Sequence, residues 1–150
     1  MSTIHLLLVD DEERFLETTS KLLRRQGVEA LTSTNGVDAL KMLKDNRIDV
    51  VVLDVKMPGL DGGEVLRKIR QNYPLVEVIM LTGHASVESA VEGLKLGAFD
   101  YLMKPSSIEG IMAKATEAAK KKWAAEEKIR KAKIERIISH PMAVFEKEER

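Results

Sequence analysis

The sequence predicts an α/β domain built on a doubly wound, five-stranded parallel sheet, and three observations carry this prediction. Short β-branched or leucine-rich runs alternate five times with longer amphipathic stretches, the pattern of parallel strands joined by helices. Of the 150 residues, 44% are hydrophobic, enough to bury one full core. The longest apolar runs are about five residues, whereas a membrane span needs roughly 20. Neither membrane insertion nor a signal peptide is therefore expected.

The strands are predicted at residues 4–9, 28–32, 49–53, 76–81 and 99–103. The run 49–53 (DVVVL) is the most strand-like and suits the centre of the sheet, whereas the polar second strand suits an edge. With right-handed crossovers, these placements favour the order 2-1-3-4-5 of flavodoxin-like folds. Sites in such sheets form beyond the carboxyl ends of the strands where the winding direction switches, here between strands one and three.

A helix is predicted after each strand, at about residues 12–26, 36–44, 61–72 and 86–96, with a fifth from about Ser107 that can continue past residue 130. Gly27 and Gly97 directly follow the first and fourth helices, at the position that favours glycine. Asp61 can cap the third helix. Pro105, after Lys104, forces a turn and can follow a cis peptide bond.

Three carboxylates are predicted to converge at the switch point. Asp10 and Asp11 end the first strand, and Asp54 ends the third. Like charges this close repel, and without a cation the pKa of one carboxyl would have to rise. A hard divalent ion such as Mg²⁺ resolves the conflict. The alternative is that these aspartates are ordinary helix caps, as Asp11 alone could be.

A hydroxyl and an ammonium are expected at the same edge, because Thr82 ends the fourth strand and Lys104 follows the fifth. Together with carboxylates and Mg²⁺ they would make a site for a phosphoryl group, with Asp54 as the candidate nucleophile. Taken singly, Lys104 could be a solvated surface lysine and Thr82 a β-branched strand end. The combination at four strand ends favours the phosphoryl site.

This ordered set resembles the receiver domain of two-component response regulators, of the single-domain, chemotaxis-regulator type, over about residues 3–120. The resemblance implies that a histidine kinase or phosphotransfer protein supplies a phosphoryl group to Asp54. It also implies Mg²⁺ ligation by the three aspartates and the backbone carbonyl of Lys56, and phosphoryl binding by Thr82 and Lys104. The residues that carry the resemblance are Asp10-Asp11, Asp54, Met57-Pro58-Gly59, Thr82 and Lys104-Pro105.

The resemblance further implies a switch at Tyr101, three residues before Lys104, where the family carries an aromatic residue that changes rotamer. Phosphorylation would draw the Thr82 hydroxyl inward and change the surface of the fourth helix, fifth strand and fifth helix. The alternative for Tyr101 is a half-buried strand tyrosine. Lys56 and His84 lie two residues after Asp54 and Thr82, at positions that flank the attacking water in this family, and are hypothesised to modulate phosphate lifetime.

The C-terminal part differs in charge from the rest. Residues 1–119 carry 14 basic and 18 acidic side chains, whereas residues 120–150 carry 10 basic and 6 acidic, so that the chain totals zero. We expect a receiver domain at residues 1–120 and a helical extension with a frayed tail at 121–150, ended as a helix by His140-Pro141. The extension is a solvated helix, a dimerising helix or a partner-docking helix, and its heptad pattern is weak.

The leading hypothesis is a phosphorelay signalling module rather than an enzyme: a cytoplasmic phosphoacceptor that acts on an unknown downstream protein. If the chain forms a homodimer, the interface is expected at either the fourth helix–fifth strand–fifth helix face or the C-terminal helix. Direct DNA binding is not expected, since the extension is too short for a second domain. One alternative is a receiver fragment of a larger transcription activator whose output domain is absent. A haloacid-dehalogenase-like phosphatase is disfavoured because its DxD pattern is missing, and a non-phosphorylated scaffold because Asp54, Thr82 and Lys104 are retained.

Overall fold

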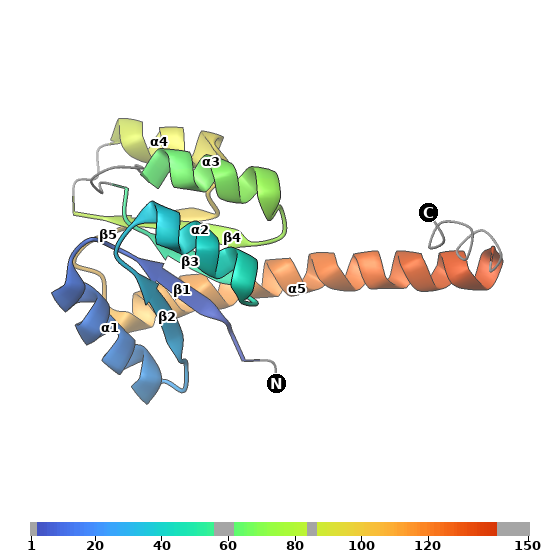
Figure 1. Ribbon diagram of the computed structural model, residues 1–150, viewed down its shortest axis with the longest axis horizontal. Coiled ribbons are helices and arrows are strands. Elements are labelled where there is room, and N and C mark those ends of the chain that lie inside the picture. The colour runs from blue at the N-terminus through green and yellow to red at the C-terminus, as the bar shows by residue number, and fades with distance from the viewer. Residues whose placement is uncertain (1–2, 56–61, 84–86, 141–150) are drawn as a thin grey trace.

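The computed structural model describes residues 3–55, 62–83 and 87–140. Strands and helices alternate strictly along the chain, as the sequence predicted (Figure 1). The strands are β1 (Leu6–Val9), β2 (Ala30–Ser33), β3 (Val50–Leu53), β4 (Glu77–Thr82) and β5 (Asp100–Met103). The helices are α1 (Glu13–Arg25), α2 (Gly36–Asp45), α3 (Gly62–Asn72), α4 (Val87–Lys95) and α5 (Ile108–Ser139).

The five strands form one parallel sheet in the order β2-β1-β3-β4-β5, which confirms the predicted topology. β3 lies at the centre and is fully buried, whereas the more polar β2 lies at an edge. The winding direction reverses between β1 and β3, which are direct neighbours with Val9 opposite Leu53. The chain segments that follow these two residues therefore leave the sheet side by side.

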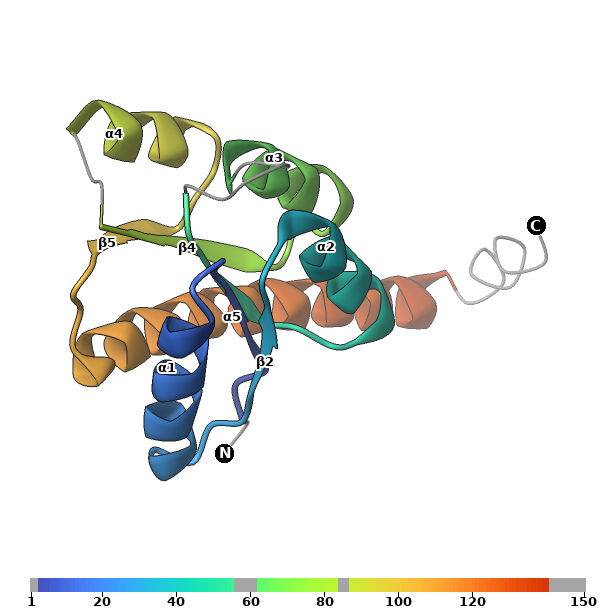
Figure 2. The same cartoon turned by 60° about the vertical axis from the view of Figure 1, so that its left-hand side comes forward.

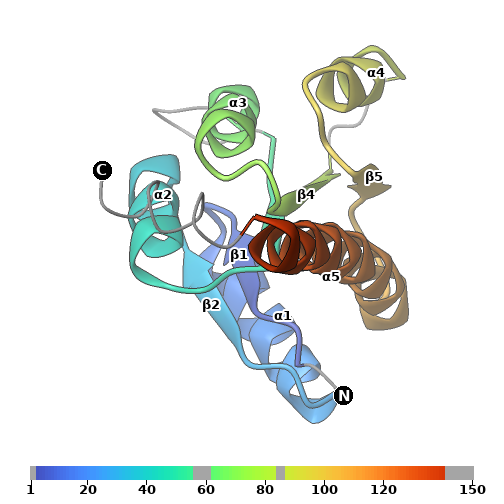
Figure 3. The same cartoon turned by 90° about the vertical axis from the view of Figure 1, so that its right-hand side faces the viewer.

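Helices cover both faces of the sheet. α1 and α5 lie on one face and α2, α3 and α4 on the other, as the end-on view shows (Figure 3). Side chains of β1 alternate between the two cores: Leu6 and Leu8 pack with α1 and α5, whereas Leu7 and Val9 pack with α2 and α3. Burial on both faces explains why the central strands are continuously apolar in sequence.

The helix ends follow from local chemistry. The side chain of Asn35 accepts a hydrogen bond from the backbone N–H of Asp38 at 2.8 Å and begins α2. Gly27 and Gly97 have φ of 83° and 103°, the left-handed conformation predicted for them. β2 begins two residues later than predicted, because the N–H of Val28 bonds the carbonyl of Leu23 at the end of α1. The expected cap at Asp61 lies outside the described residues.

The last helix is much longer than the sheet needs. α5 spans 32 residues, and its C-terminal half projects beyond the body of the domain (Figures 1 and 2). The side chain of Ser107 accepts a hydrogen bond from the N–H of Gly110 at its start, and His140 is its C-cap, as the sequence predicted. Within the part of the chain that the structure describes, no helix combines the length and apolarity that crossing a membrane requires.

A charged cluster at the amino ends of the strands fixes α5 where it leaves the sheet. Lys122 Nζ lies 2.8 Å from Asp49 Oδ1, and both side chains are almost completely buried. Asp49 Oδ2 also accepts a hydrogen bond from the backbone N–H of His5 at 2.9 Å and lies 3.2 Å from its Nδ1. These hydrogen bonds outweigh the effect of burial and lower the pKa of Asp49. His5 thus has a structural role beside Asp49. Through Lys122, α5 remains attached to the sheet two residues beyond position 120, where the receiver was expected to end.

Candidate functional site

An acidic cluster lies at the carboxyl edge of the sheet, at the predicted switch point. Asp10 follows β1 and Asp54 follows β3, and carboxylate oxygens of Asp10, Asp11 and Asp54 all lie within 4.8 Å of one another. Asp10 and Asp54 are only 2% and 6% exposed, whereas Asp11 is exposed. The structure therefore brings together all three carboxylates that the sequence selected.

Backbone hydrogen bonds position the two buried aspartates. The N–H of Asp10 donates to the carbonyl of Ser33 at 3.0 Å, and the N–H of Asp54 donates to the carbonyl of Val9 at 2.9 Å. Each bond continues the parallel ladder for one residue beyond the strand. The carboxylates are consequently held on rigid backbone rather than on free loops. Asp11 is not the cap of α1, because Glu12 occupies that position, so the helix-cap alternative does not apply to it.

Gly62, at the start of α3, packs against the backbone that carries Asp54, a contact that sequence reasoning missed. Its N–H donates to the carbonyl of Val55 at 3.1 Å. A Cβ at position 62 would lie 2.6 Å from the carbonyl oxygen of Asp54 and 2.7 Å from the Cα of Val55, both closer than real contacts. Only glycine allows α3 to begin this close to the segment that carries Asp54.

Lys104 points into the cluster from the end of β5. Its Nζ lies 2.5 Å from Asp10 Oδ2 and 3.1 Å from Glu12 Oε1, and its side chain is 15% exposed. The peptide bond between Lys104 and Pro105 is cis, in keeping with the expectation for this turn. The sequence predicted the ammonium at this edge but not its contact with Glu12.

Burial and charge oppose each other in this group of side chains. Burial raises the pKa of Asp10 and outweighs the hydrogen bonds from Lys104 and from the N–H of Glu12. Burial alone would lower the pKa of Lys104, but the hydrogen bonds to Asp10 and Glu12 dominate and raise it. Burial therefore makes an ionised Asp10 costly in spite of its contact with Lys104. Three carboxylates with this spacing fit a hard divalent cation.

The other predicted site residues are placed only in part. Thr82 is the last residue of β4, paired with Met103, and a Cβ at Gly83 would lie 3.9 Å from the Cβ of Lys104. This backbone arrangement brings the end of β4 beside the lysine. Tyr101 is half-buried and packs against the core shared with α2 and α3. The remaining predicted residues lie outside what the structure describes: Lys56, Met57-Pro58-Gly59, His84 and the side chain of Thr82.

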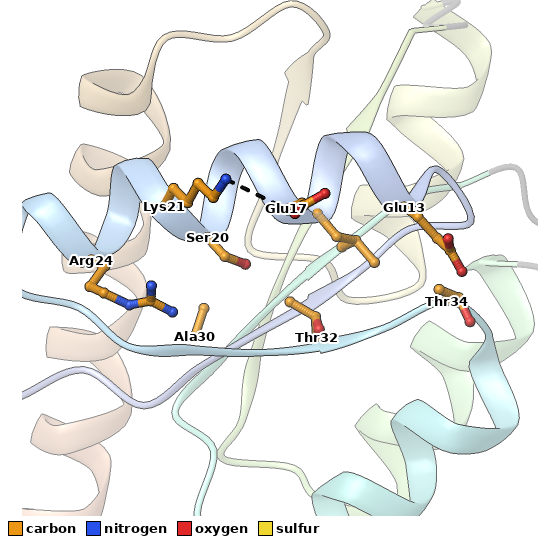
Figure 4. A pocket seen from close by; sticks show the side chains of 9 residues that line it. Glu13, Glu17, Ser20, Lys21, Arg24, Ala30, Thr32 and Thr34 are labelled. Carbon is orange, nitrogen blue, oxygen red and sulfur yellow. Dashed lines mark ion pairs between the residues drawn. The ribbon is translucent and has the colours of Figure 1, made fainter.

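Among the described residues, one surface groove lies apart from this site. A groove of about 540 Å³ runs between α1 and the outer strand β2, with Glu13 and Thr34 at one end and Arg24 at the other (Figure 4). An ion pair of 4.0 Å joins Glu17 and Lys21 along it. The groove is open and polar, and the three aspartates do not line it.

Comparison with known proteins gives the family. The model of the response regulator receiver domain matches residues 6–116. The chain belongs to the response regulator receiver domain family. This receiver domain is 38% identical over 107 residues to an NtrX-like response regulator of Rickettsia bellii, and the match covers 70% of the chain and 22% of the relative. It is also similar to a solved response regulator receiver domain from Clostridium thermocellum, at 35% identity and a TM-score of 0.77. That match covers 81% of this chain and 98% of the solved chain.

A second solved structure is a beryllofluoride-activated NtrC4 receiver domain dimer. It is 36% identical, with a TM-score of 0.74, and the match covers 79% of this receiver domain and 98% of that chain. The curated relatives are longer: the chain spans 22% to 48% of their length. The likeness therefore concerns the receiver portion of these larger regulators.

Proposed function

We propose that this receiver domain accepts a phosphoryl group on Asp54 from a histidine kinase or a phosphotransfer protein, in a Mg²⁺-dependent reaction. The observation that carries the proposal is the convergence of three carboxylates within 4.8 Å at the switch point of the sheet, beside the ammonium of Lys104. The donor of the phosphoryl group would be a phosphohistidine, and a small acyl phosphate can replace it in vitro.

The residues present suit the implied metal. Asp10, Asp11 and Asp54 would hold Mg²⁺, with the backbone carbonyl of Lys56 as a further ligand implied by the family resemblance. When bound, the ion would neutralise phosphoryl oxygens during transfer. The raised pKa of Asp10 supports this role, because burial makes its ionised carboxylate costly and a bound cation would stabilise that carboxylate.

The transfer itself is an in-line displacement at phosphorus. An oxygen of the Asp54 carboxylate forms the new O–P bond while the P–N bond of the donor breaks, and the electron pair returns to the donor imidazole. Lys104 and Thr82 would bond the phosphoryl oxygens as charge develops on them. The chain would catalyse only its own phosphorylation and dephosphorylation, with Lys56 and His84 modulating the latter. It would act in the cytoplasm, where such donors are made.

The output would be a change of protein contacts. Tyr101 is expected to change rotamer with Thr82 and to alter the surface of α4, β5 and α5. This surface exposes large apolar side chains that include Val91, Leu94 and Met103. A homodimer would use it or the C-terminal half of α5, which exposes Ile129 and Ile134. Size-exclusion chromatography with and without beryllofluoride tests the proposed homodimer. A chain that stays monomeric under both conditions would refute it.

We further propose a receiver at residues 1–120 and an extension at 121–150, with the buried pair of Lys122 and Asp49 anchoring the start of the extension to the sheet. A second candidate is that the chain is the receiver of a larger transcription activator, which the greater length of its relatives favours. Immunoblotting of the native protein with an antibody against residues 120–139 separates the two. A product of about the length of this chain supports the single-domain proposal, and a much longer product supports the activator.

Acetyl phosphate with Mg²⁺, read out by intact mass, tests the central proposal. The wild-type chain is expected to gain one phosphoryl group, and Asp54→Asn is expected to gain none. Asp45→Asn, at the end of α2, is a matched control that should label like wild type. No gain by the wild type, or an undiminished gain by Asp54→Asn, would refute the proposal.

A further inference from the structure

The ammonium of Lys104 is enclosed by more than the acidic cluster. Besides Asp10 and Glu12, the ring of Phe15 lies against it, with 4.2 Å from Nζ to the ring centroid. Phe15 is half-buried on the first turn of α1, and Glu12 directly precedes this helix. An aromatic face at this distance attracts an ammonium because the ring face carries partial negative charge.

Glu12 is oriented for this contact. It occupies the cap position of α1, yet its side chain makes no capping hydrogen bond. Its carboxylate instead lies 3.1 Å from Lys104 Nζ, while its backbone N–H donates to Asp10 Oδ1 at 2.9 Å. The loop that carries Asp10 and Asp11 thus also carries Glu12, one of the groups that hold the lysine.

Under the proposed function, the ammonium of Lys104 would also bind the phosphoryl group on Asp54. A divalent cation on Asp10 would repel it, and a phosphoryl group on Asp54 would attract it. We propose that Phe15 and Glu12 hold Lys104 in a resting position against Asp10, so that they oppose loading of the cluster with a divalent cation and a phosphoryl group. This inference rests on the proposed function and adds two positioning residues to it. Both lie outside the set that the sequence selected.

Phe15 offers a test without a change of charge. Phe15→Leu keeps apolar bulk against the core of α1 and α5 but removes the aromatic face. Because the resting position is then weaker, the variant is expected to bind Mg²⁺ about two- to five-fold more tightly than the wild type, as a cation–π contact of ordinary strength implies. Phe99→Leu is the control: Phe99 packs on the same core, and its ring faces Lys121 at 5.7 Å instead. Unchanged or weaker Mg²⁺ binding by Phe15→Leu would overturn the proposal.

Proton NMR of the full-length chain reports the position of Lys104 directly. In the metal-free wild type, the ring current of Phe15 should shift the ε-methylene protons of Lys104 upfield, and Mg²⁺ with beryllofluoride should abolish this shift. In the absence of metal, Glu12→Gln should reduce the upfield shift of this resonance, moving it part of the way toward its position with Mg²⁺ and beryllofluoride. An unshifted wild-type resonance, or no effect of Glu12→Gln, would refute the resting position. These readouts need no phosphoryl transfer, so a failure to label Asp54 would refute the proposed function alone.

Discussion

Lys122 donates a hydrogen bond of 2.8 Å to Asp49 across 73 residues of sequence, and both side chains are buried. Removal of the ammonium would leave the carboxylate of Asp49 buried with weaker partners. We expect Lys122→Met to lower the free energy of unfolding by about 3 kcal/mol, the cost of breaking a buried ion pair from one side. Urea denaturation measures this loss. Lys120→Met, at an exposed neighbouring position, is the control and should change stability little.

Acid should weaken the same contact. The folded state lowers the pKa of Asp49 below its ordinary value of 3.8, because the hydrogen bonds from Lys122 and His5 outweigh burial. The stability it contributes is therefore present above that value and is lost as the pH falls below it. Urea denaturation from pH 7 to pH 3 should show a steeper acid loss for the wild type than for Asp49→Asn. Parallel pH profiles would show that Asp49 is not the group responsible.

A truncated chain should need residues beyond the family match at 6–116 for its full thermal stability. A chain that ends at residue 120 lacks Lys122, and also Lys121, whose Nζ lies 3.6 Å from the buried carboxylate of Glu77. A chain that ends at residue 127 retains both. We expect thermal unfolding of the shorter chain at a clearly lower temperature than that of the longer one. Equal melting temperatures would show that residues 121–127 add no stability to the receiver.

Glycine at position 62 should be required for the geometry of the site. Gly62→Ala forces a Cβ against the backbone of Asp54 and Val55, and it should cost about 2 kcal/mol of stability and slow phosphorylation. Gly93→Ala is the comparison, because its Cβ would make an ordinary 3.6 Å contact with Met80. Chemical denaturation and acetyl phosphate labelling measure both effects. Wild-type behaviour of Gly62→Ala would mean that α3 can move away from the site.

Neutralisation of Asp10 should stabilise the metal-free protein. Burial raises the pKa of Asp10, so ionisation destabilises the folded state as the pH rises from 3.8 through the raised value. At neutral pH in EDTA, Asp10→Asn is therefore expected to melt at a higher temperature than the wild type. Added Mg²⁺ should stabilise the wild type through binding and the variant much less. A variant that melts lower in EDTA, or that gains equally from Mg²⁺, would contradict this account of the cluster.

The sheet order and the acidic cluster were predictable because both follow from strand periodicity. Once the runs ending at Val9 and Leu53 are read as neighbouring parallel strands, Asp10 and Asp54 must emerge side by side. The edge position of β2 follows in the same way from its polar side chains. Each of these inferences needs only local pattern and the rules for parallel connections.

Three contacts were not predictable because they depend on how distant elements pack. The fit of Gly62 against Asp54 depends on where α3 begins relative to β3. The aromatic contact between Phe15 and Lys104 joins α1 to the end of β5, and nothing in either local sequence indicates it. Lys122 stands in a run of basic residues that resembles a solvated face, and only the docking of α5 selects it for burial.

The site of phosphorylation tests the central claim most directly. Chain treated with acetyl phosphate and Mg²⁺ can be reduced with borohydride, which converts an aspartyl phosphate side chain to that of homoserine, and then mapped by tandem mass spectrometry. The reduced residue is expected at Asp54 alone. Reduction at Asp10 or Asp11, or no reduced residue in a chain that carries phosphate, would contradict the assignment of Asp54 as the acceptor.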